Sequence, residues 1–206
     1  MTTTPTSPTP AEAAAMLFEG NQRFVSGQLQ HPHQGAEDRA AVAPAQRPFA
    51  VLFGCSDSRL AAEIIFDQGL GDLFVVRTAG HVAGSEVLGS IEYGVSVLGA
   101  PLVVVLGHDS CGAVGAALTA VQQGTAPDGY IREVVERVML SVLAVREEAS
   151  TDPQQAVEEH IRYTSELILR RSSMIAERVA DGRCGVLGLS YRLAEGTVRQ
   201  VVGHGV

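Results

Sequence analysis

The chain has 206 residues, 46% of them hydrophobic and 18% charged, and a chain of this length buries enough surface to need no disulfide scaffold. Its 15 basic residues, all of them arginine, and its 23 acidic residues give a formal net charge of −8. No basic stripe runs along the sequence, so nucleic acid is excluded as an expected partner.

The N-terminus and the cysteine count indicate where the protein works. The first ten residues lack the basic and apolar regions of a signal peptide, and the sequence has no run of about 18 apolar residues. We therefore expect no membrane segment and a cytoplasmic protein. An odd number of cysteines, too few for a secreted disulfide framework, points to metal or redox chemistry at Cys55, Cys111 or Cys184.

The N-terminal region divides into a tail and a helix. Residues 1–9 are rich in Thr and Pro and offer nothing apolar for burial, so we predict a flexible tail before a single domain over residues 10–206. Pro10 suits a first helical turn, and apolar residues recur on one face of a predicted helix over residues 10–27. This helix packs either on its own domain or on a partner subunit, and the sequence leaves both open.

Short apolar runs alternate with helical patterns through the first two thirds of the chain. Three continuous runs predict buried parallel strands, at residues 49–54, 72–76 and 101–107. Each run is followed by a helical pattern, over residues 61–69, 85–99 and 111–124. This alternation is typical of βαβ crossovers.

The C-terminal part contributes two longer helices and a hairpin. Helical patterns cover residues 130–149 and 154–181, the second with Asp152 as its N-cap and Pro153 at the first helical position. Residues 184–202 contain two β-type runs around an Ala-Glu-Gly turn and predict a hairpin at the sheet edge. The expected fold class is α/β, with a mostly parallel central β-sheet, flanking helices, an N-terminal helical arm and a C-terminal edge hairpin.

Cysteine and histidine side chains follow two of the predicted strands. Cys55 ends the first run, and His108 and Cys111 follow the third. Ligands of open α/β sheets bind at the carboxyl ends of the strands, and a Cys₂His set is known from catalytic zinc sites, where it leaves a fourth position for water or substrate. Alone, an H-x-x-C motif is more often chance, but the convergence of both segments favours zinc over hard cations. Cys184 is interpreted as a structural thiol.

Asp57 and Arg59 lie two and four residues beyond Cys55. A carboxylate in that place either ligates the metal or pairs with the guanidinium. We therefore predict a switch, in which the site is open while Arg59 holds Asp57 and closed when Asp57 takes the fourth metal position. The alternative is an ordinary loop salt bridge, which is worth little where it is exposed.

The segments CSDSR and GHDSCG together resemble the signature of the β-class carbonic anhydrases. The resemblance implies one Zn²⁺ per subunit, bound by Cys55, His108 and Cys111. It also implies a catalytic dyad of Asp57 and Arg59, and reversible hydration of carbon dioxide to bicarbonate and a proton by attack of zinc-bound hydroxide. Because two thiolates donate more charge than imidazoles, we expect activity to favour alkaline pH.

The resemblance extends to the substrate pocket of plant-type members. By spacing, the glutamine of that pocket falls on Gln46, its aromatic residue on Phe74 and its tyrosine on Tyr93. The resemblance implies that Gln46 hydrogen-bonds bicarbonate or the zinc-bound solvent and that both rings line an apolar pocket, although their sequence patterns alone favour plain core aromatics. A neighbouring subunit is implied to complete the pocket, so we expect a homo-oligomer, a dimer or a tetramer, with the active site at the dimer interface.

The chain departs from the family pattern at two places. After the second predicted strand it has R-T-A-G-H, from Arg77 to His81, where many relatives have R-N-V-A, so the pocket wall is expected to differ. Some bacterial relatives carry an inhibitory bicarbonate site that includes a Trp at the position of Leu52, and we expect that site to be absent or incomplete here. His81 and His33 are candidate proton shuttles.

Three other interpretations are compatible with the sequence. Relatives with the same zinc site hydrolyse carbon disulfide or carbonyl sulfide, and sequence alone does not separate these substrates from carbon dioxide. A non-catalytic bicarbonate or redox sensor would keep Asp57 on the zinc or release the metal when the thiols oxidise. A purely structural zinc site is the weakest alternative, because such sites normally have four protein ligands.

Overall fold

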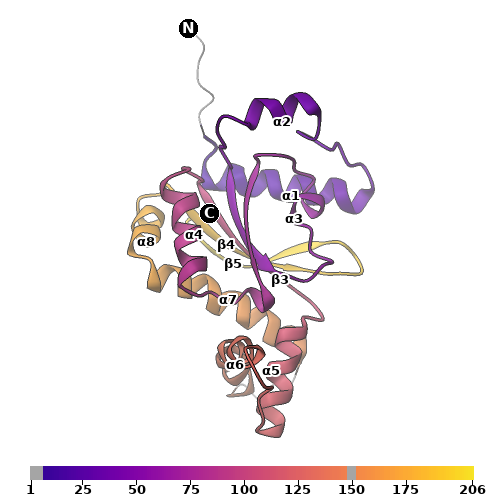
Figure 1. Ribbon diagram of the computed structural model, residues 1–206, viewed down its shortest axis with the longest axis vertical. Helices are drawn as coiled ribbons and strands as arrows, with labels where there is room; N and C mark the ends of the chain where they lie inside the picture. Colours follow the sequence, from indigo (N-terminus) through magenta and orange to yellow (C-terminus); the bar gives the residue numbers. More distant parts are fainter. Residues whose placement is uncertain (1–6, 148–151) are drawn as a thin grey trace.

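A five-stranded sheet forms the centre of the computed structural model, which describes residues 7–147 and 152–206 (Figure 1). Its strands are β1 (Ala50–Cys55), β2 (Leu73–Thr78), β3 (Leu102–His108), β4 (Gly185–Tyr191) and β5 (Val198–His204). The spatial order is β2-β1-β3-β4-β5, with β5 antiparallel to β4 and every other pair parallel. The structure thereby confirms the predicted α/β class with a mostly parallel sheet and an edge hairpin.

Helices connect and cover the strands. The α-helices are α1 (Pro10–Ser26), α2 (Ala36–Val42), α3 (Ala62–Ile65), α4 (Ser85–Ser96), α5 (Gly112–Gln123), α6 (Ile131–Glu147), α7 (Pro153–Arg171) and α8 (Ser173–Ala180), and a 3₁₀ turn, η1, covers Ala79–His81. Among the described residues, no helix combines the length and the apolar character that crossing a bilayer requires.

Two helical predictions differ from the structure, and one helix of the structure has no predicted counterpart. The helix predicted over residues 154–181 is two helices, because Ser172 has an extended backbone (φ −111°, ψ 99°) and its hydroxyl accepts a hydrogen bond from the N–H of Ile175 at 3.2 Å. The helix predicted over residues 61–69 is the single turn α3. α2 has no predicted counterpart, because it buries no residue and so carries no periodic apolar signal.

The first helix begins at Pro10, as predicted, and its cap lies inside the segment that was expected to be a flexible tail. Thr9 accepts a hydrogen bond from the backbone N–H of Glu12 at 3.2 Å, and the Glu12 carboxylate accepts one from the N–H of Thr9 at 2.7 Å. This capping box orders Thr9. Residues 1–6 of the predicted tail lie outside the described residues.

One face of α1 packs on its own domain. Leu17 is fully buried, and the amide nitrogen of Asn21 donates to the carbonyl oxygens of Ile65 at 3.1 Å and of Gly196 at 2.8 Å. The amide oxygen of Asn21 accepts from the N–H of Val198 at 3.0 Å. Hydrogen bonds of Asn21 thus hold the helix against α3 and the turn of the C-terminal hairpin.

Helices cover both faces of the sheet. A Cβ added at Gly185 of β4 would lie 3.1 Å from Pro10 of α1, and one added at Gly188 would lie 2.7 Å from Ile161 of α7. Because successive residues of a strand face opposite sides, α1 and α7 lie on opposite faces (Figure 1). α8 contacts α4 and α7, which places these three helices together on one face. β1, β3 and β4 are consequently buried at every position.

The edge strand β2 differs from the three buried strands. Five of its six residues are only partly buried, and Arg77 is exposed. Four consecutive apolar residues lie in this strand, from Leu73 to Val76. Within one chain, β2 therefore presents a half-covered apolar edge, which is uncommon for a strand that pairs in parallel.

Candidate metal centre

The carboxyl ends of the adjacent strands β1 and β3 bring Cys55 and His108 together, and α5 begins directly after Cys111. All three side chains are buried. The two sulfur atoms and a ring nitrogen of His108 lie within 4.8 Å of one another. The three residues that the sequence assigns to a metal therefore meet at one edge of the sheet.

The hydrogen bonding of His108 leaves one ring nitrogen for a metal. Its Nδ1 lies 2.8 Å from the carbonyl oxygen of Asp109, and because a carbonyl only accepts, Nδ1 carries the proton. Nε2 is buried and has no hydrogen-bond partner among the described residues. A buried lone pair beside two thiols fits Zn²⁺, since imidazoles that bind zinc donate their other N–H to a carbonyl, a carboxylate or water.

The three thiols of the chain differ in acidity. Hydrogen bonds from Cys111 and from the backbone N–H groups of Asp57 and Gly80 hold the pKa of Cys55 well below its usual value. The bond that Cys111 shares with Cys55, together with burial, raises the pKa of Cys111. Burial raises the pKa of Cys184 to about 11, so this third thiol stays protonated at neutral pH. Cys55 is therefore the first thiolate of the cluster.

Asp57 and Arg59 form a bidentate ion pair beside the cluster. Nη2 of Arg59 donates to Oδ2 of Asp57 at 2.7 Å, and Nε and the backbone N–H of Arg59 donate to Oδ1 at 2.9 Å. These bonds hold the pKa of the Asp57 carboxyl well below its usual range. The Asp57 side chain is 17% exposed and its Oδ2 lies 3.9 Å from Nε2 of His108. One carboxylate thus lies between the arginine and the metal-binding atoms.

Arg77 holds the loop that carries Asp57. The strand register pairs Arg77 of β2 with Gly54 of β1. Its Nε donates to the carbonyl oxygen of Cys55 at 2.9 Å, and its Nη2 donates to that of Asp57 at 2.5 Å. The guanidinium therefore fixes the backbone between Cys55 and Asp57, a role that the sequence did not indicate.

The three residues of the predicted substrate pocket lie far from the metal cluster of their own chain. Gln46 precedes β1, whose six residues separate its two ends by about 17 Å. Phe74 lies about 13 Å along β2 from Thr78, the residue that pairs with Cys55. Its ring centroid is 6.1 Å from that of Tyr93, which is 47% exposed. One chain therefore carries the two halves of the predicted site at opposite ends of its strands.

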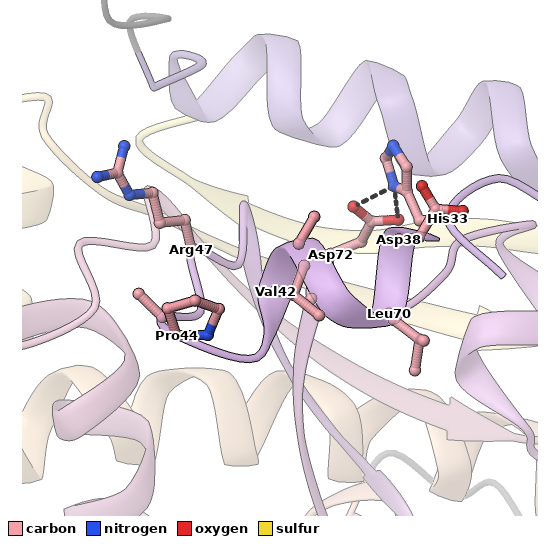
Figure 2. A pocket seen from close by; sticks show the side chains of 10 residues that line it. His33, Asp38, Val42, Pro44, Arg47, Leu70 and Asp72 are labelled. Atoms are coloured by element: carbon pink, nitrogen blue, oxygen red, sulfur yellow. Dashed lines mark hydrogen bonds and ion pairs between the residues drawn. The ribbon is translucent and has the colours of Figure 1, made fainter. Parts of the chain in front are cut away.

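A cavity of about 430 Å³ is lined by Ala45 and Arg47, the two neighbours of Gln46 in the chain (Figure 2). Its labelled lining residues are His33, Asp38, Val42, Pro44, Arg47, Leu70 and Asp72. Nδ1 of His33 lies 2.9 Å and 2.8 Å from the two carboxylate oxygens of Asp72, and this bond raises the pKa of His33. Figure 2 shows the guanidinium of Arg47 pointing away from that pair. The cavity is separate from the Cys₂His cluster, which lies at the carboxyl end of β1.

The two candidate proton shuttles lie in different surroundings. His81 is 1% exposed, and burial lowers its pKa so that the ring stays neutral. Neither ring nitrogen of His81 has a hydrogen-bond partner among the described residues. His33 is exposed and paired with Asp72, at the end of the sheet where Gln46 also lies. The ring of His81 instead packs on that of His160, with centroids 4.4 Å apart.

The fold and the buried Cys₂His cluster define an α/β protein whose site can hold a metal ion. Comparison with known proteins gives its family. A family model described as carbonic anhydrase matches residues 50–198. The chain is 56% identical over 187 residues to carbonic anhydrase 2 of Mycobacterium tuberculosis, covering 91% of this chain and 90% of that protein. It is 53% identical over 189 residues to the carbonic anhydrase of Mycolicibacterium smegmatis, covering 92% of each.

Solved structures agree with these relatives. The β-carbonic anhydrase CcaA superposes with a TM-score of 0.71 at 25% identity, covering 91% of this chain and 94% of that one. The β-carbonic anhydrase CafA of Aspergillus fumigatus gives 0.69 at 26% identity, covering 92% and 90%. The chain belongs to the β-class carbonic anhydrase family and is an enzyme of that family. The resemblance of CSDSR and GHDSCG to this family is thereby confirmed.

Proposed function

We propose that the chain catalyses the reversible hydration of carbon dioxide to bicarbonate and a proton, with one Zn²⁺ per subunit bound by Cys55, His108 and Cys111. The main support is the buried, unpartnered Nε2 of His108 in a cluster whose ligand atoms lie within 4.8 Å of one another. A Cys₂His set selects zinc and leaves a fourth position for a small molecule. When bound, zinc supplies the Lewis acidity that makes water a nucleophile near neutral pH.

Asp57 and Arg59 are the proposed catalytic pair. Oδ2 of Asp57 lies 3.9 Å from Nε2 of His108, close enough for the carboxylate to accept a hydrogen bond from a solvent molecule beside the cluster and to orient it toward substrate. Arg59 keeps the same carboxylate away from the metal-binding atoms through bonds of 2.7 Å and 2.9 Å. Release of Asp57 toward the metal would exclude solvent, so the pair opens or closes the site.

A second copy of the chain is the proposed source of Gln46, Phe74 and Tyr93. Each lies toward the opposite end of the strands from Cys55, and the edge strand β2 presents a half-covered apolar side on which another copy can pack. Carbon dioxide is small and apolar, so the two rings suit its pocket, while the Gln46 amide suits bicarbonate. The β-carbonic anhydrases of Sordaria macrospora, which share the fold, are described as tetrameric. We propose a dimer or a tetramer with the active site at the dimer interface.

The cytoplasm is the proposed compartment. The three cysteines are all free in the structure. Thiols persist in reducing compartments, and a zinc site with two cysteine ligands requires them to remain reduced. Oxidation of Cys55 and Cys111 would remove two of the three proposed ligands.

Stopped-flow hydration of carbon dioxide by the zinc-loaded protein, on both sides of neutral pH, tests the proposed function. We expect activity that rises with pH, loss of zinc and of activity in Cys111→Ser, and a smaller loss on the acid side in Asp57→Ala than in the wild type. A zinc-loaded wild type without hydration activity at any pH would contradict the proposal. Turnover of carbon disulfide or carbonyl sulfide by that same preparation would then assign a sulfur substrate.

A further inference from the structure

A series of buried hydrogen bonds leads from α6 and α7 to the sulfur of Cys55. The backbone N–H of Gly80 donates to Cys55 Sγ at 3.3 Å. The carbonyl oxygen of Gly80 lies 2.8 Å from Nε2 of His160 on α7, and Nδ1 of His160 lies 3.0 Å from the hydroxyl of Ser141 on α6. His160 is 2% exposed and Ser141 1%. Neither side chain takes part in the chemistry proposed above.

The donors and acceptors of this series follow from its members. The carbonyl of Gly80 can only accept, so Nε2 of His160 carries the proton. Burial lowers the pKa of His160 to about 4, so the ring is neutral at pH 7 and its Nδ1 is an acceptor. The hydroxyl of Ser141 therefore donates to Nδ1. Ser141 fixes the tautomer of His160, and His160 in turn holds Gly80.

The turn at Gly80 needs such support. Gly80 has a φ of 61° and His81 a φ of 41°, so two consecutive residues are in the left-handed region, which is unfavourable for the non-glycine residue. The hydroxyl of Thr78 closes the turn by donating to the carbonyl oxygen of Val82 at 3.0 Å. Nε2 of His160 donates to the carbonyl oxygen of the peptide group between Gly80 and His81, within the core.

We propose that His160 is a positioning residue for the metal centre. It holds the turn at Gly80 so that the N–H of Gly80 points at the sulfur of Cys55, and Ser141 holds His160 in the tautomer that this requires. An N–H donor of this kind fixes the direction of the sulfur lone pairs and draws electron density from them. The inference rests on the proposed zinc site but not on the reaction carried out there.

Four variants separate positioning from general stability. His160→Phe keeps a ring of similar size and removes both nitrogens, whereas His160→Gln retains an amide N–H that can reach the carbonyl of Gly80. Ser141→Ala leaves the ring and removes the hydroxyl that fixes its tautomer. Ser165→Ala is the matched control, because Ser165 is fully buried on the same helix and its hydroxyl donates to the carbonyl oxygen of Ile161 at 2.8 Å, with no link to Gly80.

Two readouts that do not depend on turnover test the inference. The first is the Kd for zinc, measured by competition with a chromophoric chelator, and the second is the thiolate-to-metal charge-transfer band of the Co²⁺-substituted protein. We expect His160→Phe to weaken zinc binding by about 10- to 100-fold, the range typical of lost outer hydrogen bonds to metal ligands. We also expect the band to move to longer wavelength, because the sulfur has lost a hydrogen-bond donor.

Each of the other variants gives a result that supports or overturns the positioning role of His160. His160→Gln should return both values most of the way to wild type, and Ser165→Ala should leave them unchanged. A folded His160→Phe with wild-type affinity and spectrum overturns the inference, and so does an equal loss in Ser165→Ala. If His160→Phe does not fold, Ser141→Ala decides, with a smaller loss in the same direction expected and no change overturning the inference. A wild type that binds no zinc would contradict the proposed function itself.

Discussion

Oδ2 of Asp57 lies 2.7 Å from Nη2 of Arg59 and 3.9 Å from Nε2 of His108, so one carboxylate faces both its counter-ion and the metal-binding cluster. The hydrogen bonds from Arg59 hold the pKa of Asp57 well below its usual range, and the carboxylate therefore remains ionised near neutral pH. Arg59 thus controls the position of the Asp57 carboxylate and not its charge.

Removal of Arg59 should close the site. In Arg59→Ala the carboxylate is free to move toward the metal, and we expect carbon dioxide hydration to fall by about 10- to 100-fold with zinc retained. The double variant Arg59→Ala/Asp57→Ala should recover part of the loss, since no carboxylate is left to close the site. Stopped-flow rates and zinc content measured on the same samples check this.

Arg183→Ala is the matched control for Arg59→Ala. Arg183 pairs with Asp181 at the same two-residue spacing, with Nη2 of Arg183 2.6 Å from Oδ2 of Asp181, and both side chains are exposed. This control should keep wild-type activity, because an exposed ion pair away from the cluster contributes little. If Arg59→Ala is as active as Arg183→Ala, the pair at Asp57 is an ordinary loop salt bridge and the switch is wrong.

A side chain at Gly80 should destabilise the turn beside the Cys₂His cluster. Its φ is 61°, and an added Cβ would lie 2.6 Å from Cβ of Ala113, in the first turn of α5 beside Cys111. Gly80→Ala should therefore lower the free energy of unfolding by about 1–3 kcal/mol and weaken zinc binding. Gly115→Ala, on an exposed face of α5 with nothing near its added Cβ, should raise it by about 0.5–1 kcal/mol. Urea unfolding measures both, and equal effects would contradict the steric argument.

The sequence predicts those parts of the fold whose signals are local. The runs at β1 and β3 are apolar throughout because both faces of these strands are buried, and Pro10 and Pro153 mark the starts of α1 and α7. The end of α7 could not be predicted in this way. The hydroxyl of Ser172 donates to Glu92 at 2.6 Å, 80 positions away in the chain, and this tertiary contact fixes the break.

Some residues of the candidate site could likewise be predicted from the sequence, and others could not. Cys55, His108 and Cys111 could be found because parallel strands end at one edge of the sheet, which brings side chains from distant segments together. His160 gave no signal, since a histidine in the middle of an amphipathic helix resembles any half-buried residue. Its role depends on the packing of α7 against the turn at Gly80, which no local pattern records.

The pairing of His33 with Asp72 should make a pH-dependent contribution to the free energy of unfolding. The hydrogen bond to Asp72 raises the pKa of His33, and a raised pKa in the folded state contributes stability below the unfolded pKa that is lost as pH rises through the folded one. The difference in unfolding free energy between wild type and Asp72→Asn should therefore be larger in mildly acidic solution than in alkaline solution. The effect should be small, because the His33 side chain is 56% exposed.

Urea unfolding of both proteins across this pH range, with an NMR titration of His33, measures the effect. The His33→Gln protein serves as the control, since adding Asp72→Asn to it should change the unfolding free energy equally at every pH. A difference between wild type and Asp72→Asn that does not vary with pH would show that the two groups are not coupled.

The separation of Gln46 from Cys55 at the two ends of β1 predicts complementation between inactive variants. Gln46→Ala lacks the proposed bicarbonate contact and Cys55→Ser lacks a proposed zinc ligand, so each alone should be nearly inactive. In a mixed dimer, the intact cluster of one subunit meets the intact Gln46 of the other, and one of the two sites is restored. Random mixing makes half of the dimers mixed, so an equimolar co-refolded sample should regain about a quarter of wild-type activity.

A mixture of Gln46→Ala with Asp57→Ala/Cys55→Ser distinguishes complementation between subunits from partial recovery of activity within a single chain. That mixture still contains one intact cluster and one intact Gln46 in each mixed dimer, so it should regain the same activity. The double variant Gln46→Ala/Cys55→Ser mixed with Gln46→Ala should regain none, because no subunit then carries the glutamine. Activity that never exceeds the sum of the separate variants would show that Gln46 does not act across the interface, and the half-covered edge of β2 would need another explanation.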